Sequence, residues 1–281
     1  MTLINFHNFS FRYKGNEEYA LKNINLELDT NKFILLLGET GSGKTTLIRC
    51  MNGLIPQFYS GFYKGWIEVK GADTSKVPIA DLSTVVGVVF QNPENQLVSM
   101  NVEHEIAFGL ENWGFPRDHI QKKIEEVSEL TGIQPLLDKA PFEISGGEQQ
   151  RVAIASILAL EPELLILDEP TTNLDPFFAE KIVNLLKEIQ RKKGLSVIIS
   201  EHRLDLILPL ADEIILMKEG EILQHAEKDE VLNGDTFKSL DINKPLFYSI
   251  FEKLQQKGVF DESFPVSLDE ALHVIKKRLK T

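Results

Sequence analysis

A glycine-rich loop between residues 38 and 46 carries the strongest chemical signal in the sequence. It fits the pattern G-x-x-x-x-G-K-[ST] and lies between the apolar run FILLL and the helical segment TTLIRCMNGL. Glycines let the backbone wrap around phosphates, Lys44 adds a full charge, and the Thr45 hydroxyl can hold Mg²⁺. The expected phosphate-binding residues are Gly38, Glu39, Thr40, Gly41, Ser42, Gly43, Lys44, Thr45 and Thr46. The loop predicts a nucleotide site, with a plain turn before a helix as the alternative.

Two adjacent carboxylates, Asp168 and Glu169, follow the apolar run LLIL. Ligands gather at the carboxyl ends of parallel strands, so this pair is expected near the phosphate loop. Alternation along the strand would turn the two side chains apart, so that Asp168 assists Mg²⁺ and Glu169 polarises an attacking water. By itself the pair would indicate a solvated loop, but together with the phosphate loop it predicts hydrolysis.

Two further polar residues follow predicted strands. Gln91 comes directly after VVGVVF, and His202 lies two residues beyond SVIIS. Gln91 could sense Mg²⁺ and water, and His202 could hydrogen-bond the γ-phosphate. Singly, each would be an ordinary loop or structural residue. The remaining histidines show no metal-ligand spacing with one another or with Cys50, which is expected to be a small buried filler.

A second candidate anion site lies at Ser145-Gly146-Gly147-Glu148, before the helical run VAIASILAL. Ser145 can cap a helix, and the two glycines expose backbone N–H groups at its positive end. An ordinary capped helix is the alternative, and the chemistry of the segment alone does not decide between the two.

The elements that must position these residues follow from the apolar pattern. An opening with strand-like alternation leads into short apolar runs that alternate with helical segments, which predicts an α/β fold with a largely parallel sheet. Apolar residues recur at helical spacing after Pro116, within a mostly helical stretch, and Asn233-Gly234-Asp235 forms a boundary. We therefore predict a domain over 1–233, with a helical subdomain at about 95–160, and a helical extension over 234–281.

The extension contains two amphipathic patterns. Residues 244–257 place Leu246, Phe247, Ile250, Phe251 and Leu254 on one helical face. Residues 267–280 place Leu268, Leu272, Ile275 and Leu279 behind a capping box formed by Ser267 and Glu270. Such helices either pack on their own domain or hold two subunits together.

Composition excludes several classes of protein. The 281 residues are 43% apolar and carry a formal net charge of −12, which favours a globular chain without affinity for nucleic acid. Its apolar runs are too short to span a bilayer. Met1 to Phe11 lacks the features of a secretory signal, and the single cysteine has no disulfide partner, so a cytoplasmic location is expected.

The motifs, taken in order, resemble those of the ABC-type ATPases. The match covers the phosphate loop, Gln91, ISGGEQQ, LLILDE, the following PTTNLD and His202, within residues 3–232. The resemblance implies a P-loop NTPase of the ABC-ATPase type, with an antiparallel β subdomain, a helical subdomain and a short helical extension. It implies that ATP, with Mg²⁺ at Thr45, Gln91 and Asp168, lies between one subunit's phosphate loop and the other's Ser-Gly-Gly segment.

The same resemblance assigns two more residues and marks one departure. Tyr13 is expected to stack on adenine, and Asp175 to contact the opposite subunit. Glu148 stands where the family usually has glutamine. Its negative charge near an anion site could slow or tune turnover, with Arg151 offsetting it.

Within the family, the sequence most resembles the ATPases of energy-coupling-factor importers, which take up vitamins, cobalt or nickel. The segment Gln91-Asn-Pro-Glu-Asn-Gln-Leu97 and the helical tail carry this likeness. It implies three partners at the cytoplasmic face of the membrane: a second ABC ATPase, an integral membrane scaffold and a substrate-binding membrane subunit. Alternatives are another ABC transporter group, a soluble ABC ATPase of DNA repair or translation, and a P-loop kinase. The sequence specifies neither the solute nor whether the ATPase pairs with itself.

Overall fold

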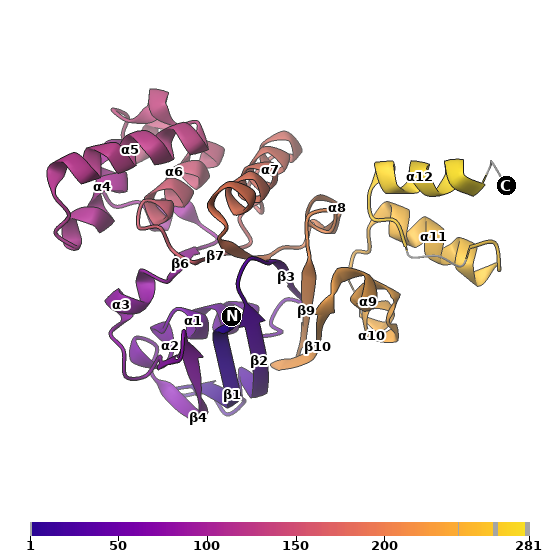
Figure 1. The fold of residues 1–281 in the computed structure, drawn as a ribbon. Helices are drawn as coiled ribbons and strands as arrows, with labels where there is room; N and C mark the ends of the chain where they lie inside the picture. The colour runs from indigo at the N-terminus through magenta and orange to yellow at the C-terminus, as the bar shows by residue number, and fades with distance from the viewer. Residues whose placement is uncertain (1, 241, 261–263, 279–281) are drawn as a thin grey trace.

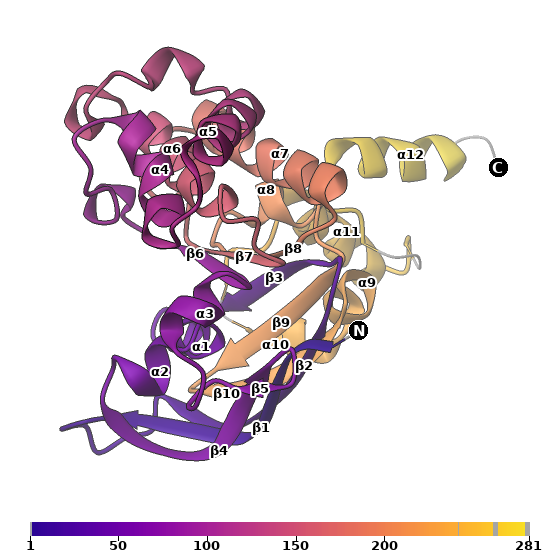
Figure 2. The same ribbon diagram turned by 60° about the vertical axis from the view of Figure 1, so that its left-hand side comes forward.

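The computed structural model describes residues 2–240, 242–260 and 264–278, and its strands form two sheets (Figures 1 and 2). The antiparallel sheet has the order β2-β1-β4-β5, with β1 (Thr2–Tyr13), β2 (Leu21–Asp29), β4 (Gly61–Val69) and β5 (Ala72–Asp73). The second sheet has the order β10-β9-β3-β8-β7-β6, with β3 (Phe33–Gly38), β6 (Val86–Val89), β7 (Leu164–Asp168), β8 (Ser196–Ser200), β9 (Glu213–Lys218) and β10 (Glu221–Glu227). All its neighbours are parallel except β9 and β10.

The apolar patterns explain the two sheets. Residues of β3, β6, β7 and β8 are buried on both faces, which is why these strands are continuous apolar runs. In β2, buried and exposed residues alternate, as expected for a sheet with one solvated face. The two strand-like runs at the start of the chain form one strand, β1, whose pairing with β2 shifts register between Phe6 and Phe9. Asn8, between them, has a φ of 47°.

The helices gather in separate groups (Figure 1). They are α1 (Lys44–Met51), α2 (Leu54–Gln57), α3 (Ile79–Ser83), α4 (Val102–Asn112), α5 (Arg117–Thr131), α6 (Gly146–Leu158), α7 (Pro176–Lys193), α8 (Leu204–Ile207), α9 (Lys228–Asn233), α10 (Asp235–Ser239), α11 (Leu246–Gln256) and α12 (Leu268–Arg278), with 3-10 turns at Pro93–Asn95, Gln134–Leu136 and Pro141–Glu143. Helices α4, α5 and α6 pack together at one end of the molecule. Ile124 and Val127 of α5 are buried, as their spacing predicts. Within the described ranges, none of the helices is apolar over a length that would cross a membrane.

The tail occupies the end of the molecule opposite α4 and α5 in both views (Figures 1 and 2). Tyr248 and Phe251 of α11 are buried, and the Tyr248 hydroxyl donates to the carbonyl oxygen of Leu232 at 2.9 Å. Leu246 and Ile250, predicted on the same apolar face as Phe251, are 63% and 43% exposed. The domain therefore covers only part of the predicted face, at Phe251 beside the buried Tyr248, and leaves Leu246 and Ile250 exposed.

The start of α12 also departs from the expected capping box. The Ser267 hydroxyl accepts a hydrogen bond from the Glu270 N–H at 3.2 Å, as predicted. The Glu270 carboxylate, however, accepts from the N–H of Val266 at 2.9 Å, one residue before the expected partner. Leu279 lies outside the described residues. The α/β fold with an antiparallel sheet, a helical group and a helical extension is confirmed, whereas the domain boundaries at 95–160 and 233/234 stay predictions.

Candidate nucleotide-binding and catalytic site

The phosphate loop joins β3 to α1 and depends on glycine at two crowded points. Gly43 has a φ of 104°, and a Cβ there would lie 2.8 Å from the carbonyl oxygen of Ala20. A Cβ on Gly38 would lie 2.4 Å from the carbonyl oxygen of Met217. Since both neighbours are backbone atoms, only glycine allows the loop to close this tightly.

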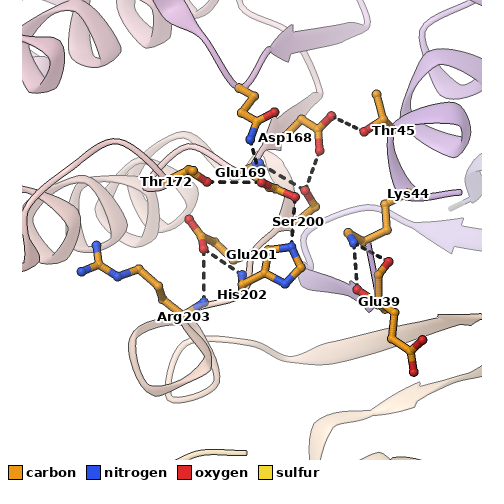
Figure 3. Close-up of polar contacts among 12 residues, drawn as sticks. Glu39, Lys44, Thr45, Asp168, Glu169, Thr172, Ser200, Glu201, His202 and Arg203 are labelled. Atoms are coloured by element: carbon orange, nitrogen blue, oxygen red, sulfur yellow. Dashed lines mark hydrogen bonds and ion pairs between the residues drawn. The ribbon is translucent and has the colours of Figure 1, made fainter. Parts of the chain in front are cut away.

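Lys44 begins α1 and is 6% exposed. Its Nζ donates to the carbonyl oxygens of Gly38 at 2.8 Å and Glu39 at 3.1 Å, so the amine is held against the loop (Figure 3). Burial lowers the pKa of Lys44, and the carboxylates of Glu169 and Asp168 oppose that shift. An ammonium group held in this way is well placed to meet a phosphate anion.

The Ser42 hydroxyl oxygen is another feature that suits an anion. Ser42 is 3% exposed, and among the described residues its Oγ has no hydrogen-bond partner. Buried hydroxyls normally find a partner, so this atom has capacity to donate to a ligand oxygen. It lies within the loop that the sequence predicts to bind phosphates.

Thr45 and Asp168 provide oxygen atoms that fit Mg²⁺. The Thr45 hydroxyl donates to Oδ2 of Asp168 at 2.8 Å, and Asp168 is 5% exposed. In the described part of the chain, no group of three or more His, Cys, Asp or Glu side chains is placed to hold a metal ion. Magnesium in nucleotide sites characteristically takes one or two protein oxygens and completes its shell with phosphates and water, so this pair fits it.

Glu169 lies at the centre of the polar cluster in Figure 3. Its carboxylate accepts from Gln91 Nε2 at 2.8 Å and from the Thr172 hydroxyl at 3.3 Å, and lies 3.1 Å from His202 Nε2. Its φ of 49° is in the left-handed region, which is unusual for glutamate. Asp168 and Glu169 do point in different directions, but the cause is this turn after β7 and not strand alternation.

One cavity of about 560 Å³ brings together six residues of the phosphate loop with the predicted residues Gln91, Glu169 and His202. It is lined by Ala20, Thr40, Gly41, Gly43, Lys44, Thr45, Thr46, Gln91, Glu169 and His202. Residues from five separate segments of the chain therefore line the same space, among them the phosphate-binding loop and the carboxylate of Glu169. This arrangement can bind a phosphate chain and orient a water against it.

Ser200 belongs to this site and sequence reasoning missed it. Its hydroxyl donates to Oδ1 of Asp168 at 2.6 Å, and the N–H of Glu169 donates to Ser200 Oγ at 3.1 Å. One side chain thus fixes the orientation of both acidic residues. Asp168 and Ser200 are register partners on β7 and β8. Its place at the end of the predicted strand SVIIS, two residues before His202, was the available signal.

The signature segment, Ser145–Glu148, does not line this cavity. Ser145 is the N-cap residue of α6, and its N–H and hydroxyl both donate to Glu148 Oε2 at 2.8 Å. These bonds lower the pKa of Glu148, with smaller contributions from Lys139 and Arg151. A Cβ on Gly147 would meet the Phe178 ring at 3.3 Å, whereas one on Gly146 would meet nothing within 4 Å.

Tyr13 and Asp175 have clear partners within the chain. The Tyr13 hydroxyl lies 3.2 Å from Thr46 Oγ1 and accepts from Arg49 NH1 at 3.1 Å, which places the ring beside α1. Asp175 is the N-cap of α7, and its Oδ1 accepts from the N–H groups of Phe177 and Phe178 at 2.9 and 3.1 Å. Adenine stacking and a cross-dimer contact stay predictions for these residues.

A family model described as ABC transporter matches residues 21–172. A putative ABC transporter ATP-binding protein of Pyrococcus horikoshii is 36% identical over 277 residues, which are 98% of this chain and 97% of the relative. The chain belongs to the ABC transporter ATP-binding proteins. Members of this family are ATPases that use ATP with Mg²⁺, and the cavity described above has the corresponding chemistry.

Solved structures of other ABC cassettes have the same fold. This cassette is similar to cbiO1 from Clostridium perfringens, described as part of the ABC transporter complex cbiONQ, with a TM-score of 0.75 and 32% identity over 91% of this chain and 95% of that one. It is also similar to the cassette MJ0796, solved as a dimer bound to ADP and Pi, with a TM-score of 0.69 and 27% identity over 80% and 99% of the two chains.

Proposed function

We propose that this ABC cassette hydrolyses ATP at Glu169 and thereby powers an importer of the energy-coupling-factor type. The observation that carries the proposal is the single cavity that Lys44, Gln91, Glu169 and His202 share, next to the bonded pair of Thr45 and Asp168. Similarity to cbiO1, part of the cbiONQ complex, supports the importer type.

Each residue has a distinct role in the proposed hydrolysis. Lys44 and the loop N–H groups bind the phosphates, while Thr45, Asp168 and Gln91 hold Mg²⁺. Bound Mg²⁺ neutralises charge on the phosphate oxygens. Glu169 orients and polarises the attacking water, and His202 donates to the γ-phosphate. Because Gln91 and His202 both contact Glu169 here, nucleotide entry must draw at least one of them away to leave room for water.

Two cassettes are needed in this proposal, because the signature segment does not line the chain's own cavity. Gly146 is open, so a partner's phosphates can approach the start of α6. The similar cassette MJ0796 was solved as a dimer. Ser145, Gly146, Gly147 and Glu148 then complete the partner's site, while Asp175, whose Oδ2 is left over from helix capping, contacts the opposite subunit.

A groove between the sheet and the helical group suits a membrane scaffold. Its volume is about 350 Å³ and its walls are mainly apolar, with Val98, Phe108 and Leu160 among them. Val98 is 69% exposed and Phe108 49%, and Met100, two residues after Val98 in the chain, is 86% exposed. Clustered exposed apolar side chains mark interaction sites. We therefore place the cassette at the cytoplasmic face of the membrane, where scaffold helices dock here and a separate membrane subunit selects a vitamin or metal ion.

The tail is proposed to hold two cassettes together. Leu246 and Ile250 of α11 and Leu272 and Ile275 of α12 are between 40% and 63% exposed. Tyr248 and Phe251 already anchor the tail to its own domain, so the exposed set is free for another surface. The tail thus combines both roles that its sequence pattern allows.

Co-purification tests whether this ATPase belongs to a membrane importer. The tagged chain is isolated from membranes in mild detergent, and its partners are identified by mass. We expect a second ABC ATPase, a helical scaffold and a small membrane protein, and the two membrane proteins should be lost in Met100→Asp. Leu223→Asp, at a 42% exposed position on β10, serves as the control and should keep them. Ribosomal or DNA-repair proteins without a membrane partner would refute the importer.

A further inference from the structure

The loop after β8 is tied to the segment after β7 by a buried carboxylate. Glu201 is 2% exposed, and Thr171, its partner, is fully buried. The Thr171 N–H donates to Glu201 Oε1 at 2.9 Å, and the Thr171 hydroxyl donates to the same oxygen.

The other oxygen of Glu201 holds its own loop. Oε2 accepts from the N–H groups of His202 at 2.9 Å and Arg203 at 3.3 Å (Figure 3). A buried carboxylate is costly unless donors surround it, and here four donors from two segments do so. Because these donors are mostly backbone groups, the carboxylate fixes the main chain on both sides.

Arg203 adds a second tie between the same segments. Its NH1 donates to the carbonyl oxygen of Leu174 at 3.2 Å. Between the two ties, His202 lies 3.1 Å from Glu169. Three consecutive side chains, residues 201–203, therefore each contact one residue of 169–174. A shift of His202 cannot occur without moving this segment or breaking its bonds.

The segment leads directly to the signature. Asp175 caps α7, and in the first turn of that helix the Phe178 ring lies beside Gly147, where a Cβ would meet it at 3.3 Å. A contiguous set of contacts therefore runs from His202, at the chain's own cavity, to the signature segment, which does not line that cavity. A continuous chain of contacting residues of this kind can carry energetic coupling between two sites.

We propose that Glu201 and Arg203 are positioning residues that transmit the state of His202 to residues 170–178. In the presence of a γ-phosphate, His202 moves toward it, and the two ties carry residues 170–178 along with the loop. The γ-phosphate bound by one cassette thereby sets the surface offered to the other cassette. This inference rests on the proposed function, in which His202 contacts the γ-phosphate.

Hydrogen exchange on the full-length chain tests the inference. With Mg²⁺ and AMP-PNP, but not with ADP, we expect peptides covering 170–178 to exchange roughly tenfold more slowly, the scale of a charge-assisted hydrogen bond. In Glu201→Gln and in Arg203→Met this γ-phosphate-dependent slowing should be lost. Peptides covering residues 38–46 report nucleotide binding and should respond equally in every variant. Glu213→Gln, which removes a carboxylate that pairs with Lys32 at 2.7 Å, is the control and should behave as wild type.

The outcomes separate the inference from the function it rests on. A purely structural Glu201 would speed exchange of 170–178 equally with ADP and AMP-PNP and leave the difference between the two nucleotides intact, which overturns the inference. The inference is also overturned if, in the wild-type chain, peptides covering 170–178 exchange equally fast with ADP and with AMP-PNP. No response at 38–46 in wild type would instead refute nucleotide binding itself. If Glu201→Gln does not fold, the half-buried Arg203→Met decides alone.

Discussion

The phosphate-loop side and the signature side of this cassette differ in how far a single chain completes them. Around the loop, Glu169 has partners in Gln91, Thr172 and His202, and the residues meet in one cavity. At the signature, the Ser145 N–H and hydroxyl both donate to Glu148, and Gly146 faces open space. In the first region, the residues of one chain already surround the space for a ligand. The second is a capped helix start, and its open glycine is not covered by another described part of the chain.

This contrast predicts which substitutions should affect binding of ATP to the chain's own loop and which should affect only its hydrolysis. Changes on the phosphate-loop side act on the chain's own nucleotide. Changes on the signature side leave that nucleotide bound and act only when a second cassette is present. Prearranged groups cost little reorganisation during reaction, which is the advantage of the completed side.

The largest expected effect is that of Glu169→Gln. The amide keeps the shape of the side chain but cannot accept a proton, so we expect kcat to fall by roughly 10²–10⁴-fold. Binding of a fluorescent ATP analogue should change by less than about twofold, because Lys44 and the loop are untouched. Steady-state hydrolysis and a binding titration measure the two quantities. Near-normal turnover would remove Glu169 from its role.

Gly147→Val tests the other side. The added side chain approaches Phe178 and takes up space at the N-terminus of α6, where the partner's phosphates would bind. Because misplaced phosphates react slowly, we expect turnover to fall on the order of 10²-fold. Binding of ATP to the chain's own loop should stay unchanged in a titration. The double variant Gly147→Val/Phe178→Ala relieves the internal contact. Full recovery in that variant would mean that the loss came from displacing α7 and not from the anion site.

Lys44→Ala should act on binding itself. Loss of a charge-assisted contact to phosphate is expected to raise the dissociation constant for ATP by about 10–100-fold. The titration that measures it uses Lys70→Ala as a control, since Lys70 pairs with Glu163 at the surface. Equal affinities in the two variants would contradict the role of Lys44.

The sequence allowed most of the fold and of the phosphate-loop side to be predicted. Strands β3, β7 and β8 are buried on both faces, and such strands must be continuous apolar runs. Ser200 escaped because a serine at the end of an apolar run is indistinguishable from a strand residue until its neighbour is known. The turn at Glu169 likewise depends on bonds to β8, which no local pattern records.

The tail shows a different limit. Its apolar residues lie on more than one face of α11, and spacing alone cannot tell which face the domain covers. Tyr248 is buried because its ring packs 5.2 Å from Phe237 and its hydroxyl finds a backbone carbonyl. Both partners come from the preceding helices, so only the tertiary structure reveals this anchor.

Asp175 connects the two sides, and its variants separate capping from pairing. Asp175→Ala removes the N-cap of α7 and should lower the free energy of unfolding by about 1 kcal/mol in urea denaturation. Asp175→Asn retains the cap and should be nearly as stable as wild type. If the carboxylate also contacts the opposite subunit, the Asn variant will still lose turnover. If Asp175→Asn turns over ATP at the wild-type rate, the role of Asp175 is limited to capping α7.

The smallest effect is expected at Glu148, where charge and capping act together. Its bonds to Ser145 lower the pKa of Glu148 below the usual value of 4.5, so the folded state favours the ionised form. The capping contribution is therefore fully present above about pH 4.5, the ordinary pKa of a glutamate, and is lost as the pH falls through the lower folded value. Glu148→Gln should flatten this acid limb in pH-dependent urea denaturation. At neutral pH, a faster turnover of the Gln variant would show that the negative charge restrains the partner's nucleotide, whereas unchanged turnover would show that it does not.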